Sequence, residues 1–254
     1  MAHADLRNPL ALSPFLEGLA RRYPEWLPEL EAEDRLFHHE APSADDLADT
    51  IESHGLDPGL RRFRNREMLC LTWREITGAA SLQETLGDLT RLAELCLEAA
   101  LTHHHAALTE RFGTPRGEDG SAQSLVILGL GKLGGSELNL SSDIDLILCY
   151  PSGGQCDGRR GLANETFFTR LSRAVISSLS ERTEDGFCFR VDTRLRPFGE
   201  SGPLVCSFQA LEQYYQREGR DWERYALIKA RPVAGDRTAG HALLKNLGPF
   251  VFGR

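Results

Sequence analysis

Apolar residues in the first half of the chain recur at the spacing of amphipathic helices. After Ser81-Leu-Gln-Glu84, which has the form of a capping box, apolar positions follow in alternating steps of four and three. These positions are Leu82, Leu86, Leu89, Ala93, Cys96 and Ala100. A second capping box stands at 43–46, and apolar residues lie among many arginines over 60–76. The pattern predicts a helical region.

The second half of the chain changes period. Short apolar runs at 125–130 and 144–150 are typical of buried strands, and apolar residues over 187–195 alternate with charged ones as in a half-exposed strand. Helical spacing returns over 163–181, 208–219 and 222–230. Glycine, proline and polar residues over 113–123 indicate a boundary.

The predicted fold class is therefore α+β, in three parts. Residues 1–120 are expected to form a helical N-terminal region, residues 121–235 a mixed sheet with helices, and residues 236–254 the truncated start of a following helical region.

Composition narrows the possible functions. The 254 residues carry a formal net charge of −8, which argues against a broad nucleic-acid surface. No apolar run approaches the ~20 residues of a membrane span, and the N-terminus lacks the apolar core of a signal peptide. The six cysteines are scattered without a Cys-x-x-Cys pair, so we expect reduced thiols in a cytoplasmic protein. The basic run 61–66 could dock an acidic partner, although such a run is more often a solvated helix face.

The stretch from Gly129 to Tyr150 carries the candidate chemistry. A glycine-rich turn precedes Asp143 and Asp145, which are two residues apart at the head of an apolar strand and so point to one face. At ~5 Å and an effective dielectric of ~20, two such charges repel by roughly 3 kcal/mol, which a bound cation would offset. Carboxylates with substrate phosphates suit Mg²⁺, and the N–H groups of a glycine turn suit phosphate.

Two familiar glycine motifs do not fit this turn. Gly129-x-Gly131-x-x-Gly134 matches the dinucleotide fingerprint, but too few residues separate it from the next strand to hold a crossover helix. A P-loop requires Lys-Ser or Lys-Thr, whereas Leu133 follows Lys132.

A nucleotidyltransferase palm accounts for the turn and the acids together. Gly135-Ser136 would hold phosphate, Asp143 and Asp145 would bind the metal, and Asp192 on the later strand is the natural third carboxylate. The competing interpretation of Asp192 is a structural ion pair with Arg190 or Arg194, which flank it.

Longer motifs carry a resemblance to a known family. Gly131-Lys-Leu-Gly-Gly-Ser-Glu-Leu-Asn-Leu-Ser-Ser-Asp-Ile-Asp145, Arg190-Val-Asp-Thr-Arg-Leu-Arg-Pro-Phe-Gly-Glu-Ser-Gly-Pro203 and Gly219-Arg-Asp-Trp-Glu-Arg-Tyr-Ala226 resemble the glutamine synthetase adenylyltransferase/adenylyl-removing enzymes. The chain is similar to the N-terminal of their two polymerase β-like nucleotidyltransferase domains.

The resemblance implies an activity, partners and site residues. It implies Mg²⁺-dependent removal of AMP from a tyrosine of glutamine synthetase by phosphorolysis to ADP, paired in the full-length family with ATP-dependent adenylylation and controlled by PII-type signal proteins. Nucleic acid and membrane are not expected partners. The metal ligands would be Asp143, Asp145 and Asp192, and the phosphate or nucleotide contacts would be Lys132, Gly134, Gly135, Ser136, Arg194 and Arg196.

Two other functions remain open at this point. The chain could be a regulatory module that binds nucleotide without turnover, or a nucleotidyltransferase acting on a small molecule. The acids alone do not give the reaction direction, because phosphorolysis and adenylylation use the same carboxylates.

Overall fold

The computed structural model describes residues 8–159 and 161–253 of the chain. The helices are α1 (Pro9–Leu12), α2 (Pro14–Arg22), α3 (Trp26–Ala32), α4 (Ala44–His54), α5 (Leu56–Thr77), α6 (Leu82–Phe112), α7 (Gly131–Gly134), α8 (Asn164–Ser180), α9 (Phe208–Arg217), α10 (Asp221–Ile228) and α11 (Arg237–Phe252), with a 3-10 turn at Gly199–Ser201. The strands are β1 (Pro115–Gly117), β2 (Val126–Gly129), β3 (Ile144–Tyr150), β4 (Gly154–Cys156), β5 (Val191–Asp192), β6 (Val205–Ser207) and β7 (Arg231–Gly235). The mixture confirms the α+β class.

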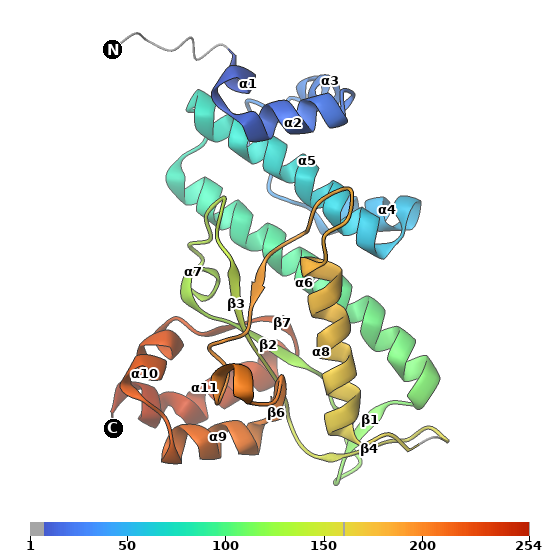
Figure 1. Cartoon of the computed structure of the whole chain (residues 1–254), viewed down its shortest axis with the longest axis vertical. Helices are drawn as coiled ribbons and strands as arrows, with labels where there is room; N and C mark the ends of the chain where they lie inside the picture. Colours follow the sequence, from blue (N-terminus) through green and yellow to red (C-terminus); the bar gives the residue numbers. More distant parts are fainter. Residues whose placement is uncertain (1–7, 160, 254) are drawn as a thin grey trace.

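The N-terminal helices form the upper part of the molecule in Figure 1, and the long helix α6 runs from there down to the sheet. As predicted, Ser81 caps α6, and its hydroxyl accepts a hydrogen bond from the Glu84 N–H at 3.2 Å. The Glu84 carboxylate does not complete a capping box, because it pairs with Arg74 at 2.5 Å. The predicted apolar face is buried at Leu89, Ala93, Cys96 and Ala100 but exposed at Leu82.

The sheet places β3 beside the strand of the third aspartate. Its order is β5-β3-β2-β7, and β6 pairs with β3 farther along the same edge. Strand β2 is antiparallel to both β3 and β7, whereas β5 and β6 are parallel to β3. The antiparallel β2–β3 pair excludes a dinucleotide-binding βαβ unit, in which those strands would be parallel.

The predicted strand over 187–195 is wrong in extent, because only Val191–Asp192 forms a strand. The N–H groups of Cys188 and Phe189 both donate to the Leu179 carbonyl at 2.9 Å, so this segment closes the C-terminus of α8 instead of joining the sheet. Cys188, expected on the exposed face, is fully buried. The breaker-rich stretch 113–123 likewise contains a short strand, β1, which pairs with β4.

One apolar cluster joins the helices to the sheet. It contains Phe63 of α5, Leu97 of α6, Leu148 of β3 and Phe168 of α8, all buried. A second cluster lies between the sheet and α9–α11, and a third packs α2 and α3 on α5. The predicted division at residue 120 remains a prediction.

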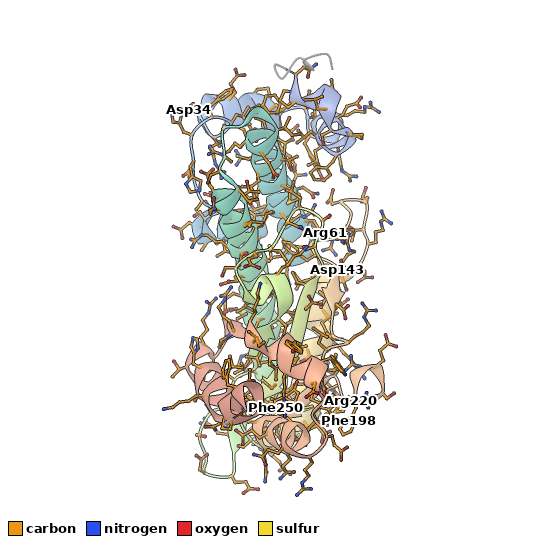
Figure 2. All side chains as sticks on the ribbon, turned by 90° about the vertical axis from the view of Figure 1, so that its left-hand side faces the viewer. Asp34, Arg61, Asp143, Phe198, Arg220 and Phe250 are labelled. Atoms are coloured by element: carbon orange, nitrogen blue, oxygen red, sulfur yellow. The ribbon has the colours of Figure 1, made fainter. Side chains whose placement is uncertain are left out.

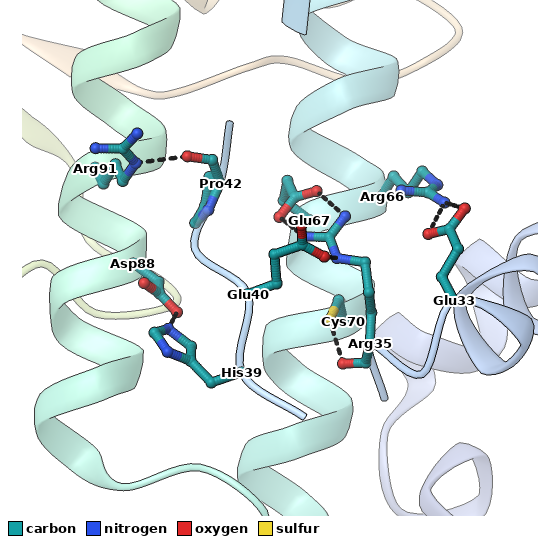
Figure 3. A network of polar contacts seen from close by, with 10 residues as sticks. All are labelled: Glu33, Arg35, His39, Glu40, Pro42, Arg66, Glu67, Cys70, Asp88 and Arg91. Carbon is teal, nitrogen blue, oxygen red and sulfur yellow. Dashed lines mark hydrogen bonds and ion pairs between the residues drawn. The ribbon is translucent and has the colours of Figure 1, made fainter. Parts of the chain in front are cut away.

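The segment between α3 and α4 is fastened by buried polar contacts (Figure 3). Arg35 forms a two-pronged ion pair with Glu67 at 2.9 and 3.0 Å, and both side chains are almost completely buried. The His39 imidazole contacts Asp88 at 2.9 Å, and Arg91 donates to the Pro42 carbonyl. These contacts hold the segment against α5 and α6.

The cysteines and the helices bear on two expectations from composition. All six cysteines are unpaired and buried, as expected for structural thiols. Within residues 8–159 and 161–253, none of the helices combines the length and apolar character that crossing a bilayer requires.

Candidate active site

Three aspartates lie near one another where β3 and β5 begin to pair, although their carboxylate oxygens do not all lie within 4.8 Å of one another. Asp145 lies directly opposite Asp192 in the parallel register, and Asp143 immediately precedes β3. Burial raises the pKa of Asp145, and the charges of Asp192 and Asp143 raise it further, while Arg194 and Lys132 oppose them. The structure therefore brings the three predicted acids into one electrostatic cluster.

Arginines balance two of these acids. Arg190 donates to the Asp143 carboxylate and to the Ser141 carbonyl, and Arg194 binds the Asp192 carboxylate at 2.5 Å. The Arg194 hydrogen bond, with its charge, lowers the pKa of Asp192. Asp192 therefore belongs to the acid cluster and also forms the ion pair with Arg194 that was the competing interpretation. The Arg190–Asp143 pair was not predicted, since parallel pairing of distant segments cannot be recognised from spacing.

The glycine turn lies against the acids. Gly131 begins α7 with a φ of +54°, and a Cβ atom there would stand 2.8 Å from the Asp145 carboxylate. A Cβ on Gly134 would lie 2.2 Å from the Lys229 carbonyl oxygen and 2.5 Å from that of Gly129. Gly134 requires glycine because backbone oxygens leave no room for a side chain, and Gly131 because its positive φ and the neighbouring Asp145 carboxylate both disfavour one.

The remaining predicted turn residues lie at the surface of this segment. Lys132 and Ser136 are exposed and Gly135 is half-buried, and Ser136 has a φ of +56°. The Lys132 charge reaches Asp145, because it lowers the pKa of that carboxyl. These residues are therefore accessible to a phosphate beside the acids.

Two basic residues near the end of the chain, Lys229 and Arg231, brace the turn. Lys229 pairs with Glu137 at 2.6 Å, and Arg231 donates to the carbonyls of Gly134 and Leu133 at 3.2 Å. Arg231 also pairs with Glu94 of α6 at 2.5 Å. Helix α6 thus helps to fix the turn, a role that sequence spacing did not reveal.

An open hollow of about 570 Å³ adjoins the acids, lined by Asp143, Asp192, Arg194, Arg196 and Glu200. Arg196 donates to the Thr193 carbonyl and hydroxyl at 2.9 Å, and its Nε is buried without a partner among the described residues. Its Nη2 donates to the Glu200 carbonyl at 3.2 Å, so this guanidinium fixes the loop after β5 and also lines the hollow. Both predicted phosphate-binding arginines therefore border the same space as the acids.

The donor set suits Mg²⁺. Carboxylate oxygens are its preferred protein ligands. Burial raises the pKa of Asp145 first and the charges of Asp192 and Asp143 second, and a divalent cation would offset that repulsion. Among the described residues, the only three ligand groups with atoms within 4.8 Å of one another are those of His39, Glu84 and Asp88. The two carboxylates of that set already have cationic or hydrogen-bonding partners, because Asp88 pairs with His39 and Glu84 with Arg74.

Helix α5 holds the segment 181–186, which leads to the third acid, Asp192. Arg61 of α5 donates to the carbonyls of Glu181 and Gly186 at 2.6 and 3.1 Å, and Asn65 donates to that of Asp185 at 3.1 Å. Arg61 is buried, so the basic run is not the solvated helix face that composition suggested. Figure 2 places Arg61 and Asp143 at a similar height near the middle of the molecule.

Comparison with known proteins identifies the family. The family model described as glutamate-ammonia ligase adenylyltransferase matches residues 3–246. Proteins named bifunctional glutamine synthetase adenylyltransferase/adenylyl-removing enzyme are 56% identical over 77% of the chain in Thioalkalivibrio sulfidiphilus and 50% identical over 98% in Pseudomonas aeruginosa. The Nitrosococcus oceani protein of the same name is 50% identical over 95% of the chain.

The chain spans 20–26% of the length of these curated relatives. The match nevertheless runs through the glycine turn, all three aspartates and the arginines beside them. The chain belongs to the glutamate-ammonia ligase adenylyltransferase family.

Proposed function

We propose that this chain carries an adenylyl-transfer site for glutamine synthetase and that its direction is removal of AMP by phosphorolysis to ADP. The register that sets Asp145 opposite Asp192, with Asp143 beside them, is the observation that carries the proposal. The printed names of the relatives include both adenylylation and adenylyl removal, and the resemblance to the N-terminal domain favours removal.

The three aspartates would hold Mg²⁺. The ion would supply positive charge to the transferring phosphoryl group and to the oxygens entering and leaving it. Asp145, between its two acidic neighbours, is the ligand whose charge most needs the cation, since both neighbours raise its pKa. For the metal to bind, Asp143 would have to leave its ion pair with Arg190, and Asp192 its ion pair with Arg194.

The arginines and the turn would orient the anions. Arg194 and Arg196 border the hollow, and a guanidinium forks well onto phosphate oxygens. The N–H groups of Gly134, Gly135 and Ser136 already donate to the carbonyls of Leu130, Gly131 and Leu133 at 3.0, 3.1 and 3.2 Å, so the predicted phosphate contact through these N–H groups is wrong. The exposed side chains of Lys132 and Ser136 would meet phosphates of the nucleotide instead.

The reaction balances without a further reactant. An oxygen of inorganic phosphate forms a bond to the phosphorus of the tyrosine-linked AMP, and the bond from that phosphorus to the tyrosine oxygen breaks. The tyrosine oxygen takes the proton of hydrogen phosphate, and ADP leaves. The same groups run in reverse would adenylylate from ADP, so the acids do not fix the direction.

The test is to incubate the chain with adenylylated glutamine synthetase, Mg²⁺ and phosphate, and to follow ADP. We expect ADP from the wild type and none from Asp145→Asn, whereas Asp119→Asn, an exposed acid away from the cluster, should retain wild-type activity. A fully active Asp145→Asn variant would exclude the proposed site.

A regulatory module is the second candidate, and the ion pairs of Asp143 with Arg190 and of Asp192 with Arg194 favour it. In that case the arginines would keep the acids from metal, and the chain would bind nucleotide without turnover. A folded wild type that binds Mg²⁺-ADP but releases no ADP from the modified substrate would support this candidate. No specific observation favours a small-molecule substrate.

The remaining assignments are also proposals. Six unpaired buried thiols support a cytoplasmic location. Glutamine synthetase, ATP, ADP and phosphate follow from the proposed chemistry, and a PII-type signal protein is expected for the longer protein.

A further inference from the structure

We infer that the cavity between α2, α5 and the segment 181–190 is a second binding site, separate from the acid cluster, for a small organic anion with an apolar body. The cavity has a volume of about 810 Å³. Typical small-molecule sites have volumes of ~300–1,000 Å³, mostly apolar walls and a few placed polar groups. The inference does not depend on the proposed activity.

The walls combine apolar and basic side chains. Phe15 and Leu19 of α2, Met68 of α5 and Phe187 supply apolar surface. Four arginines and two acids also line the cavity, so positive charge exceeds negative charge there. The arginines are Arg22, Arg64, Arg182 and Arg190, and the acids are Glu184 and Asp185.

Among the described residues, neither acid pairs with the central arginine, Arg64, and Glu184 is exposed. Asp185 is taken by Arg22 at 2.8 Å and by the Tyr23 hydroxyl at 2.5 Å. Arg190 is likewise occupied by Asp143. Two guanidinium groups, those of Arg64 and Arg182, have no carboxylate partner among the described residues.

Arg64 is the group that most needs an anion. Its only side-chain hydrogen bond among the described residues goes to the neighbouring Asn65 at 2.9 Å, and its Nε is buried without a partner. Burial lowers the pKa of Arg64, and the charge of Arg190 lowers it further. Arg64 is half-buried, and a cation partly removed from water without a counter-charge is costly, so a bound anion would relieve that cost.

The aromatic rings around Arg64 indicate the rest of the ligand. The guanidinium carbon lies 5.8–5.9 Å from the ring centres of Phe15, Phe187 and Phe189. A ligand that placed its carboxylate or phosphate on Arg64 would lay its body against Phe15, Phe187 and Met68. This chemistry describes a small anion carrying an apolar group, rather than a free inorganic ion.

Methionine labelling gives a probe inside the cavity. The chain contains two methionines, Met1 and Met68, and Met68 lines the cavity. We would label the methionine methyl groups with ¹³C, assign the Met68 signal with Met68→Leu, and titrate with phenyl phosphate, phenylacetate and benzyl alcohol. Anions bound near Arg194 or Arg196 would not produce the ring-current shift expected at Met68.

The wild type should show a saturable Met68 shift with phenyl phosphate, with a midpoint of about 1 mM or lower, as expected of a ligand this small. Arg64→Gln should raise the midpoint at least about tenfold, because a charge-assisted hydrogen bond is lost. The matched control Arg66→Gln, on the same helix but paired with Glu33 at the surface, should leave it unchanged. Saturation by phenylacetate as well would show that the site accepts carboxylates and phosphates, and saturation by phenyl phosphate alone would restrict it to phosphates.

Two results would overturn the inference: the absence of a saturable Met68 shift with either anion, or an equal midpoint for benzyl alcohol. If Arg64→Gln does not fold, the midpoint measured with Arg182→Gln tests the inference, because Arg182 is exposed and its replacement should leave the core intact. We expect this variant to raise the midpoint at least about threefold, given the charge it removes. An unchanged midpoint in Arg182→Gln would then refute the site.

Discussion

Replacing Arg61 with methionine tests how the helical part holds the segment before Asp192. The Arg61 side chain is 1% exposed and donates to the carbonyls of Asp57, Glu181 and Gly186 at 2.8, 2.6 and 3.1 Å. The last two bonds join positions more than a hundred residues apart in sequence. Methionine fills much of the same volume but donates nothing.

The magnitude follows from the two long-range bonds. A hydrogen bond from a charged donor contributes about 1.5–3 kcal/mol, so the pair contributes about 3–6 kcal/mol. The Gly186 carbonyl keeps bonds from Thr183, and the apolar part of methionine restores packing. We therefore expect Arg61→Met to lower the free energy of unfolding by about 3 kcal/mol, toward the lower end of that range.

The assay is urea unfolding followed by circular dichroism, with Arg66→Met as the control. Arg66 lies on the same helix and forms a surface ion pair with Glu33 at 2.7 Å, which contributes about 0–1 kcal/mol. Hydrogen exchange should also show faster opening of residues 181–190 in Arg61→Met. Equal stability losses in the two variants would refute the assignment of Arg61 as the main fastening of this segment.

Three further predictions concern the site and the thiols. Gly131→Ala should weaken Mn²⁺ binding at least about tenfold, since its Cβ would displace the Asp145 carboxylate, whereas Gly153→Ala, with open space around it, should not change binding. Asp145→Asn should raise the melting temperature at neutral pH without metal, because the folded pKa of Asp145 lies above its unfolded value and the ionised form opposes folding. The difference in melting temperature between variant and wild type should close as pH falls through the folded pKa. A lower melting temperature of the variant at neutral pH would contradict this. A thiol reagent such as DTNB should label the native protein slowly and all six cysteines after denaturation, and rapid native labelling would be inconsistent with their burial.

The elements that sequence predicted well are those specified by local patterns. Ser81 begins a helix because its hydroxyl satisfies a free N–H group at the helix start, and this requires no distant partner. Strand β3 follows the run 144–150 without deviation, because its residues other than Asp145 are buried and a strand buried on both faces requires apolar side chains. The i, i+2 spacing likewise placed Asp143 and Asp145 together before the fold was known.

The failures share a cause in partners that lie outside the local sequence pattern. The alternation over 187–195 resembles a strand, but the N–H groups of Cys188 and Phe189 donate to the Leu179 carbonyl and not to a neighbouring strand. The partner of Asp143 is Arg190, which is 47 residues away. The basic run on α5 was misinterpreted because Arg61 has backbone carbonyls of a later segment as partners, and composition contains no sign of them.

The loop of residues 193–204 leaves and rejoins the same edge of β3. Strand β5 ends at Asp192 beside Asp145, and β6 resumes at Val205 beside Leu148, so both ends of the loop are anchored by backbone pairing to one strand. Loops fixed in this way tolerate changes of sequence and length, because the added chain does not disturb the ladder. Exchanging this loop between relatives would therefore change the walls of the hollow while leaving the aspartates in register, which gives evolution and protein engineering a replaceable cassette for substrate choice.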